Sequence, residues 1–170
     1  MPATYDKIAA HTLPSDAASY TFTVIPSTYT DLVLVCSTLT TWTSDEYEGV
    51  GFRFNGDSAN NYSTTYLAGD GANAASFRES SQPQITTRIN PSYLSNTSPS
   101  AIVFQVQNYS NTTTNKTALI RSNSSREFYE VTACVGLWRS TAAINSLFIG
   151  NARANLKAGS TFTLYGIKAA

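Results

Sequence analysis

Apolar residues recur at every second position in many short runs along this chain. In one run, Val50, Phe52 and Phe54 alternate with a glycine and an arginine. Strand-like runs of this kind cover residues 5–13, 20–24, 32–39, 50–54, 62–68, 85–89, 102–106, 117–121, 129–137, 144–149 and 161–165. A period of two is typical of β-strands, because successive side chains point to opposite faces of a sheet. No segment shows the three-to-four-residue apolar period of a helix.

The spacing of these runs constrains the fold class. Polar turns separate the runs, and the hairpin signal Asn55-Gly56-Asp57 directly follows one of them. Short, regularly spaced strands without helical crossovers predict an all-β fold, namely an antiparallel β-sandwich of jelly-roll type with about ten strands. No linker divides the chain, so we expect one β-sandwich domain over residues 1–170, with residues 1–13 as an N-terminal arm or edge strand.

The composition predicts an uncharged polar exterior. Ser, Thr and Asn account for 57 of the 170 residues, charged residues for only 13%, and the formal net charge is zero. Such a surface suits adhesion, assembly or sugar contact, and the lack of a basic run argues against a nucleic-acid partner. No apolar stretch is long enough to span a membrane, and no secretory signal is visible. We therefore expect a complete cytoplasmic translation product that starts at Met1.

Residues suited to acid–base or metal chemistry are few. His11 is the one histidine, and no G-x-S-x-G motif accompanies it. The spacing of His and Cys lacks the close ligand pairs of zinc sites. We therefore predict that the protein is not an enzyme and needs no metal or cofactor.

One acidic cluster has two interpretations. Asp45, Glu46 and Glu48 directly precede an expected strand, which favours a solvated loop. Calcium binding is the alternative, because Asp57 and Asp70 in Gly/Asn-rich loops could supply further oxygen ligands. The spacing of these acids matches no EF-hand loop.

The two cysteines, Cys36 and Cys134, both lie in apolar, strand-like runs. This position favours two reduced, buried thiols that act as small hydrophobic residues. A disulfide that links two strands is the alternative, because the sequence does not give the distance between them.

Long polar segments and aromatic side chains are the candidates for contact with partners. Residues 68–84, 90–100 and 109–115 are expected to form loops, and long loops often carry function. Tyr and Trp suit the core, a subunit interface or a platform for sugar rings. The candidate interface or ligand contacts are Tyr5, Trp42, Tyr62, Tyr66, Tyr109, Trp138 and Arg139.

Several blocks spread over the chain carry a family resemblance. They are MPATYDKIA at residues 1–9, IPSTYTDL at 25–32, FNGD at 54–57 with NYS at 61–63, GLWRST at 136–141 with AINS at 143–146, and GSTFTLYGI at 159–167. Together they resemble a family of small virion proteins of phages that infect aquatic bacteria. The resemblance implies a place in the virion, assembled in the host cytoplasm, and it carries over no catalytic residue.

Members of that family are described as virion, capsid-decoration or tail-fibre proteins. A tail fibre needs a shaft, and the chain has no heptad pattern for one. The hypothesis is therefore a homotrimeric capsid decoration (cement) protein that stabilises the head by bridging major capsid subunits at local threefold positions. Residues 1–13 would add a strand to a neighbour. The alternative is a tail-fibre or receptor-binding module that contacts a host-surface glycan.

Overall fold

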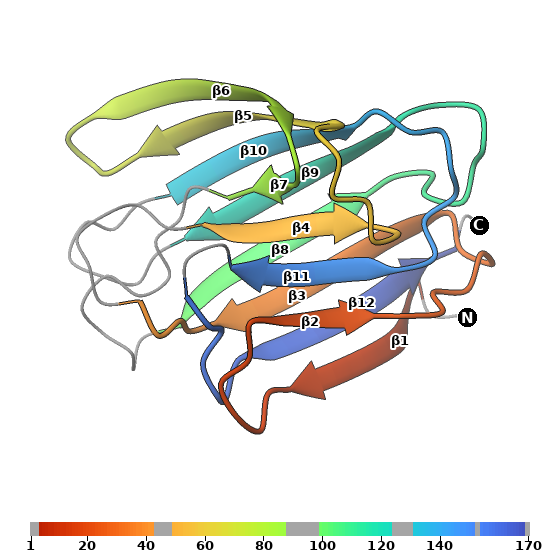
Figure 1. Ribbon diagram of the computed structural model, residues 1–170, viewed down its shortest axis with the longest axis horizontal. Helices are drawn as coiled ribbons and strands as arrows, with labels where there is room; N and C mark the ends of the chain where they lie inside the picture. Colours follow the sequence, from red (N-terminus) through yellow and green to blue (C-terminus); the bar gives the residue numbers. More distant parts are fainter. Residues whose placement is uncertain (1–3, 43–48, 88–98, 124–130, 152–153, 169–170) are drawn as a thin grey trace.

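Two antiparallel β-sheets, one of eight strands and one of four, stack on each other (Figure 1). The computed structural model describes residues 4–42, 49–87, 99–123, 131–151 and 154–168. These residues form 12 strands and no helix. In this part of the chain, therefore, no helix is long and apolar enough to cross a membrane. The predicted all-β, antiparallel β-sandwich is confirmed, with more strands than expected, and the jelly-roll arrangement stays a prediction.

The larger sheet has the strand order β1-β12-β3-β8-β9-β10-β5-β6. Every neighbouring pair in it is antiparallel. Its strands are β1 (Tyr5–Thr12), β3 (Asp31–Thr38), β5 (Tyr62–Gly69), β6 (Ala74–Gln82), β8 (Ser100–Val106), β9 (Lys116–Asn123), β10 (Val131–Trp138) and β12 (Thr161–Ile167). Consecutive strands β8, β9 and β10 form a meander at its centre, and β1 and β6 form its two edges.

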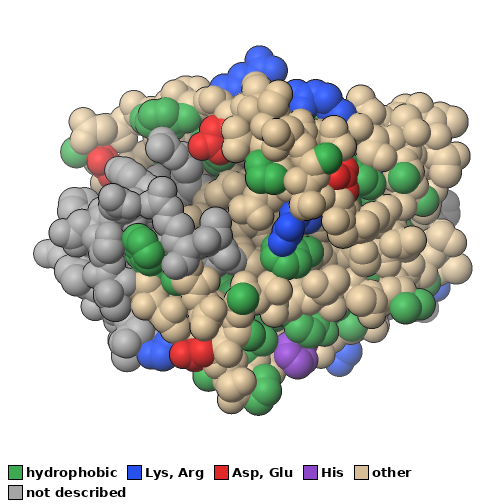
Figure 2. Space-filling view, in the orientation of Figure 1, with side chains coloured by type: hydrophobic (Ala, Val, Ile, Leu, Met, Phe, Trp, Pro, Cys, Tyr) green, Lys and Arg blue, Asp and Glu red, His purple; other side chains and the backbone are tan. Residues whose placement is uncertain are grey.

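The smaller sheet has the order β2-β11-β4-β7 and lies in front of the larger sheet in Figure 1. Its strands are β2 (Ser19–Phe22), β4 (Val50–Phe54), β7 (Ile85–Thr86) and β11 (Leu147–Asn151). Figure 2 looks onto this side of the molecule, where charged side chains are scattered among uncharged polar groups and backbone. The low-charge exterior expected from the composition is therefore visible on this side.

Aromatic rings join the two sheets in the core. Phe52 and Phe54 point inward from β4 and meet Phe104 on β8, with ring centroids 4.5 Å and 6.0 Å from it. Phe54 also packs against Trp138 on β10 at 5.4 Å. All four side chains are at most 2% exposed. The burial of large aromatic groups from both sheets is the main driving force that holds the layers together.

The segment 68–84, predicted to be a long loop, contains a nine-residue strand instead. The β5 strand continues to Gly69, a short turn follows, and β6 pairs back onto β5. In the turn, the Asp70 N–H donates to the Asn73 carbonyl at 3.1 Å. Almost every residue of β6 is exposed, because β6 is the edge strand. A strand without a buried face has no apolar alternation, and for this reason the sequence does not reveal it.

The run at 20–24 is shorter than its alternation suggests. The β2 strand ends at Phe22, and Val24 is 89% exposed with a backbone φ of 58°. A positive φ is unfavourable for a β-branched residue and incompatible with a continuing strand. The prediction for residues 109–115 was a loop, and this segment does connect β8 to β9 without a strand. Residues 88–98, which include most of the predicted loop 90–100, lie outside the described residues.

The N-terminal segment pairs within its own chain. Residues Tyr5–Thr12 form β1, which lies antiparallel to β12 at the edge of the larger sheet. Lys168 at the end of the described chain forms an ion pair with Asp6, with 3.0 Å between the ammonium nitrogen and a carboxylate oxygen. This segment is therefore an edge strand in the structure, and not a free arm.

The two cysteines are buried and free. Cys36 lies on β3 and Cys134 on β10, and two further strands, β8 and β9, separate them in the sheet. Three strand spacings amount to about 14 Å, which is more than twice the distance that a disulfide allows. The disulfide interpretation is therefore wrong. Burial raises the pKa of the Cys36 thiol, so this side chain stays protonated.

Candidate functional site

The outward side of the larger sheet exposes aliphatic side chains. Val131 and Leu67 are 63% and 62% exposed, and Leu119 and Val135 are 52% and 51% exposed. Single exposed apolar residues are ordinary, whereas a cluster of them marks an interaction site. We call the cluster of Leu67, Leu119, Val131, Ala133 and Val135 the aliphatic face.

The strand register brings these residues together. Val135 on β10 lies opposite Leu119 on β9, and Ala133 on β10 lies opposite Leu67 on β5. Directly opposite residues in an antiparallel pair have Cβ atoms about 5 Å apart. Residues i and i+2 of a strand share a face, so Val131 extends the cluster along β10. The aliphatic face is therefore one continuous patch over three adjacent strands.

The inward positions of β10 explain why its aliphatic residues point outward. Thr132, Cys134 and Trp138 alternate with the exposed residues and are at most 2% exposed. Gly136 is also buried, and Ile85 of the smaller sheet packs against its backbone. The space under the smaller sheet fits the small or aromatic residues at these positions. The alternate positions of β10, which carry the aliphatic side chains, therefore face outward.

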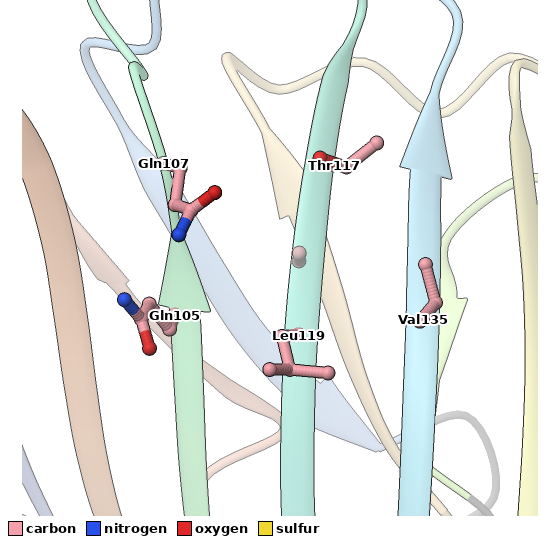
Figure 3. Close-up of a pocket in the computed structure, with 6 residues that line it drawn as sticks. Gln105, Gln107, Thr117, Leu119 and Val135 are labelled. Carbon is pink, nitrogen blue, oxygen red and sulfur yellow. The ribbon is translucent and has the colours of Figure 1, made fainter.

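A shallow depression adjoins the aliphatic face (Figure 3). It has a volume of about 200 Å³ and is lined by Gln105, Gln107, Thr117, Ala118, Leu119 and Val135. Figure 3 shows the two glutamine amides at one side of this depression and the Leu119 and Val135 side chains at the other. The surface therefore combines apolar groups with uncharged hydrogen-bonding groups, as protein interfaces do.

Four of the seven candidate contact residues lie in the core. Tyr62, Tyr66 and Tyr109 are fully buried, and Trp138 is only 2% exposed. The prediction that these aromatic residues contact a ligand or another subunit is therefore wrong for this structure. Their polar atoms are satisfied internally: the Tyr66 hydroxyl donates to Glu79 at 2.6 Å, and the Tyr109 hydroxyl donates to the Pro26 carbonyl. Buried Tyr and Trp need such partners.

The other three candidates retain exposure. Tyr5 on β1 is 54% exposed and packs edge-on against Tyr165. Trp42 is partly buried. Arg139 is exposed at the end of β10, and its guanidinium donates a hydrogen bond to the Ser63 hydroxyl. Of these three residues, only Arg139 lies next to the outward side of β10 and β5. Its partner Ser63 is on that side, because Ser63 lies opposite the outward-facing Leu137.

Asp57 organises a structural network rather than a metal site. Its carboxylate accepts hydrogen bonds from the Trp138 indole at 2.7 Å, the Asn61 amide at 3.1 Å and the Ala59 N–H at 2.9 Å. The Tyr62 hydroxyl donates to the Asp57 carbonyl at 3.1 Å. The hydrogen bonds from Trp138 and Asn61 lower the pKa of the Asp57 carboxyl. The ionised carboxylate therefore links the turn after β4 to the end of β10 through the hydrogen bond from Trp138.

Replacing Asp57 with Asn is expected to lower the free energy of unfolding by about 1–2 kcal/mol at pH 7, allowing for partial solvation of the carboxylate. Both carboxylate oxygens of Asp57 accept hydrogen bonds, whereas the Asn side chain has only one acceptor oxygen. In the variant, the NH₂ group would therefore face an N–H donor and leave it without an acceptor. Because the pKa of Asp57 is lowered by folding, its contribution is present above the ordinary pKa of about 4 and is lost as pH falls further. Urea unfolding should show that the difference in free energy of unfolding between wild type and variant is smaller at pH 3 than at pH 7.

Asp70→Asn is the matched control. Asp70 also has a lowered pKa, and its carboxylate accepts the N–H groups of Ala72 and Asn73 at 2.9 Å and 2.6 Å. These bonds stay within one exposed hairpin turn, so we expect a much smaller loss of stability. An equal deficit of Asp57→Asn at both pH values would contradict the role of its charge.

The structure bears on the remaining candidates only in part. His11 stacks on Tyr20 with 4.1 Å between ring centroids. Among the described residues, no group of three or more His, Cys, Asp and Glu side chains lies close enough to hold a metal ion. The acidic cluster Asp45, Glu46 and Glu48 lies outside the described residues. The carboxylate of Asp70 accepts hydrogen bonds from its own turn, whereas that of Asp57 also accepts one from the Trp138 indole on β10.

Comparisons with known proteins add no relative. Neither the family models, nor the curated proteins, nor the solved structures give a match to this chain. The resemblance to phage virion proteins thus stays a prediction that rests on the sequence blocks quoted above. The structure shows that one of these blocks, FNGD with NYS, contains the Asp57 network. That block therefore has a role in stability, whatever the function of the protein.

Proposed function

We propose that this chain is a structural protein of a bacteriophage virion, and specifically a capsid decoration protein. The observation that carries the proposal is the aliphatic face, a continuous apolar patch on the outward side of a broad β-sheet. Water contact with such a patch is unfavourable, so a monomer gains free energy by covering it. The sequence blocks that resemble phage virion proteins supply the biological context.

A decoration protein needs a compact domain that attaches to a shell by many identical contacts. The sandwich meets this need, because large aromatic groups fill its core and its first and last strands, β1 and β12, pair at one edge of the larger sheet. Repetition of a weak contact over a symmetric shell produces strong attachment. In this proposal the chain forms homotrimers and bridges neighbouring major capsid subunits.

The glycan-binding alternative loses support from the burial of its candidate residues. Sugar rings stack on exposed aromatic side chains, and Tyr62, Tyr66, Tyr109 and Trp138 are in the core. Two amides that line the depression, the half-buried Gln105 and the exposed Gln107, remain available for hydrogen bonds to any partner.

Electron microscopy of the intact particle tests the proposal directly. We expect the density of this sandwich to cover the head in many symmetric copies and to be grouped in threes. Light scattering on the purified chain should give the mass of a trimer. Density found only at the tail tip, in few copies, would instead favour the receptor-binding alternative.

A further inference from the structure

Three arginines surround the aliphatic face. Arg121 lies two residues from Leu119 on β9 and directly opposite Ala133. Arg78 on β6 lies opposite Thr65, which in turn lies opposite Val135. Arg139 continues the outward row of β10 and reaches Ser63. Each of these arginines is exposed.

Among the described residues, no carboxylate forms an ion pair with any of the three arginines. Asp31 shares this side of the sheet, but it lies at one end of β3 and accepts the Asn108 N–H at 2.8 Å. Glu79 is next to Arg78 in sequence but points to the other side of the sheet, where it binds Tyr66. Within the part of the chain that the structure describes, the rim of the aliphatic face is therefore positive, and no carboxylate there pairs with its arginines.

This charge pattern distinguishes between two ways of covering the face. If two copies packed these faces together, their arginines would approach one another, and like charges oppose association. A partner with carboxylates around an apolar centre would pair with the same arginines instead. Arginine is suited to this role because its planar guanidinium binds a carboxylate through two parallel hydrogen bonds.

We propose that the aliphatic face and its arginine rim dock a protein surface in which Asp or Glu side chains surround an apolar patch. This inference rests on the proposed function, in which the partner is the major capsid protein, and it adds which face binds and what chemistry the partner presents. The trimer contacts then lie elsewhere on the chain. An acidic polysaccharide fits less well, because the centre of the face is aliphatic and has no exposed aromatic ring on which sugars stack.

The experiment is a titration of the purified full-length chain onto phage heads that were assembled without it. We expect Arg78→Glu/Arg121→Glu to weaken binding about tenfold or more, and Leu119→Asn to weaken it to a similar extent. Raising the salt concentration should weaken wild-type binding and affect the double variant less. All these positions are exposed, so the thermal stability of each variant should stay close to that of wild type.

Two matched controls accompany these variants. Lys7→Glu makes the charge change of one of the two arginine substitutions on β1, five strands or about 24 Å from β10 on the same sheet. Val24→Asn replaces an apolar residue that is 89% exposed but lies outside the sheet. Each control should change binding by less than about twofold, a change that corresponds to under half a kcal/mol.

The outcomes separate this inference from the proposed function. If the wild-type chain does not bind heads at all, the proposed function fails, and the capsid as partner fails with it. If wild type binds but the arginine variant binds equally well, this inference alone is overturned. Loss of binding in the arginine variant without loss in Leu119→Asn would indicate a polyanion rather than a protein surface. A change in oligomeric mass in either variant would show that the face joins copies of the chain.

Discussion

Replacing Phe104 with Ala is expected to lower the free energy of unfolding by about 3–5 kcal/mol. The Phe104 ring is 1% exposed and lies 4.5 Å from the Phe52 ring, so it forms the contact between the larger and the smaller sheet. Removal of the ring leaves a cavity that neither hydrogen-bonded sheet can close. A domain is stable by only about 5–15 kcal/mol, so this one change removes a large share of the stability. Denaturant unfolding of the purified chain measures it.

Two variants serve as controls for Phe104→Ala. Phe104→Leu keeps part of the buried volume and should cost clearly less than the alanine variant. Leu119→Ala removes an aliphatic side chain on the next strand that is 52% exposed, and it should change stability by only about 0.5 kcal/mol. If Phe104→Ala were as mild as Leu119→Ala, the inward packing of β8 against β4 would be contradicted.

The strands with one buried face could be predicted from the sequence. Alternation at residues 102–106 marks β8, with Ile102, Phe104 and Val106 all buried. The run at 161–165 marks β12 in the same way, with Phe162 and Leu164 buried. In both strands the core imposes the period of two, because one face meets the other sheet and one does not.

Elements that depend on long-range packing could not be predicted. The edge strand β6 has no buried face, so its sequence looks like a loop. Lys116 is 1% exposed, and its ammonium group donates to the carbonyls of Thr114 and Thr141 at 2.7 Å and 3.1 Å. Nothing in the local sequence indicates that these two carbonyls meet, since they belong to segments 27 positions apart in the chain. Burial lowers the pKa of this lysine.

The sequence placed the candidate contacts on aromatic residues that are buried, and it missed the aliphatic residues that are exposed, for a similar reason. Tyr and Trp are frequent in interfaces, but Tyr66 and Trp138 find internal hydrogen-bond partners in Glu79 and Asp57, and this makes their burial favourable. The aliphatic residues of β10 look like core residues by composition. They are exposed because the opposite positions of the same strand are those that fit under the smaller sheet. The alternation signals a strand, but it does not state which of its two faces is inside.

Replacing Gly136 with Val is expected to lower the free energy of unfolding by about 2–3 kcal/mol, the second large effect on stability. A Cβ at this buried position of β10 would lie 2.6 Å from Cδ1 and 2.7 Å from Cγ2 of Ile85. Ile85 is fully buried on β7 and cannot move into solvent. The two sheets would have to separate locally, so the variant should unfold at lower denaturant concentration.

A pair of control variants isolates the clash as the cause. Gly69 also lies in a strand of the larger sheet, but a Cβ there would meet nothing closer than the Asn73 carbonyl at 3.8 Å. Gly69→Ala should therefore be neutral or slightly stabilising, because Ala costs less backbone entropy than Gly. Combining Gly136→Ala with Ile85→Ala removes the clashing atoms, so the double variant should lose less than the sum of the single changes by about 1 kcal/mol or more. Strict additivity would mean that Gly136 is needed for its backbone and not for the space that Ile85 fills.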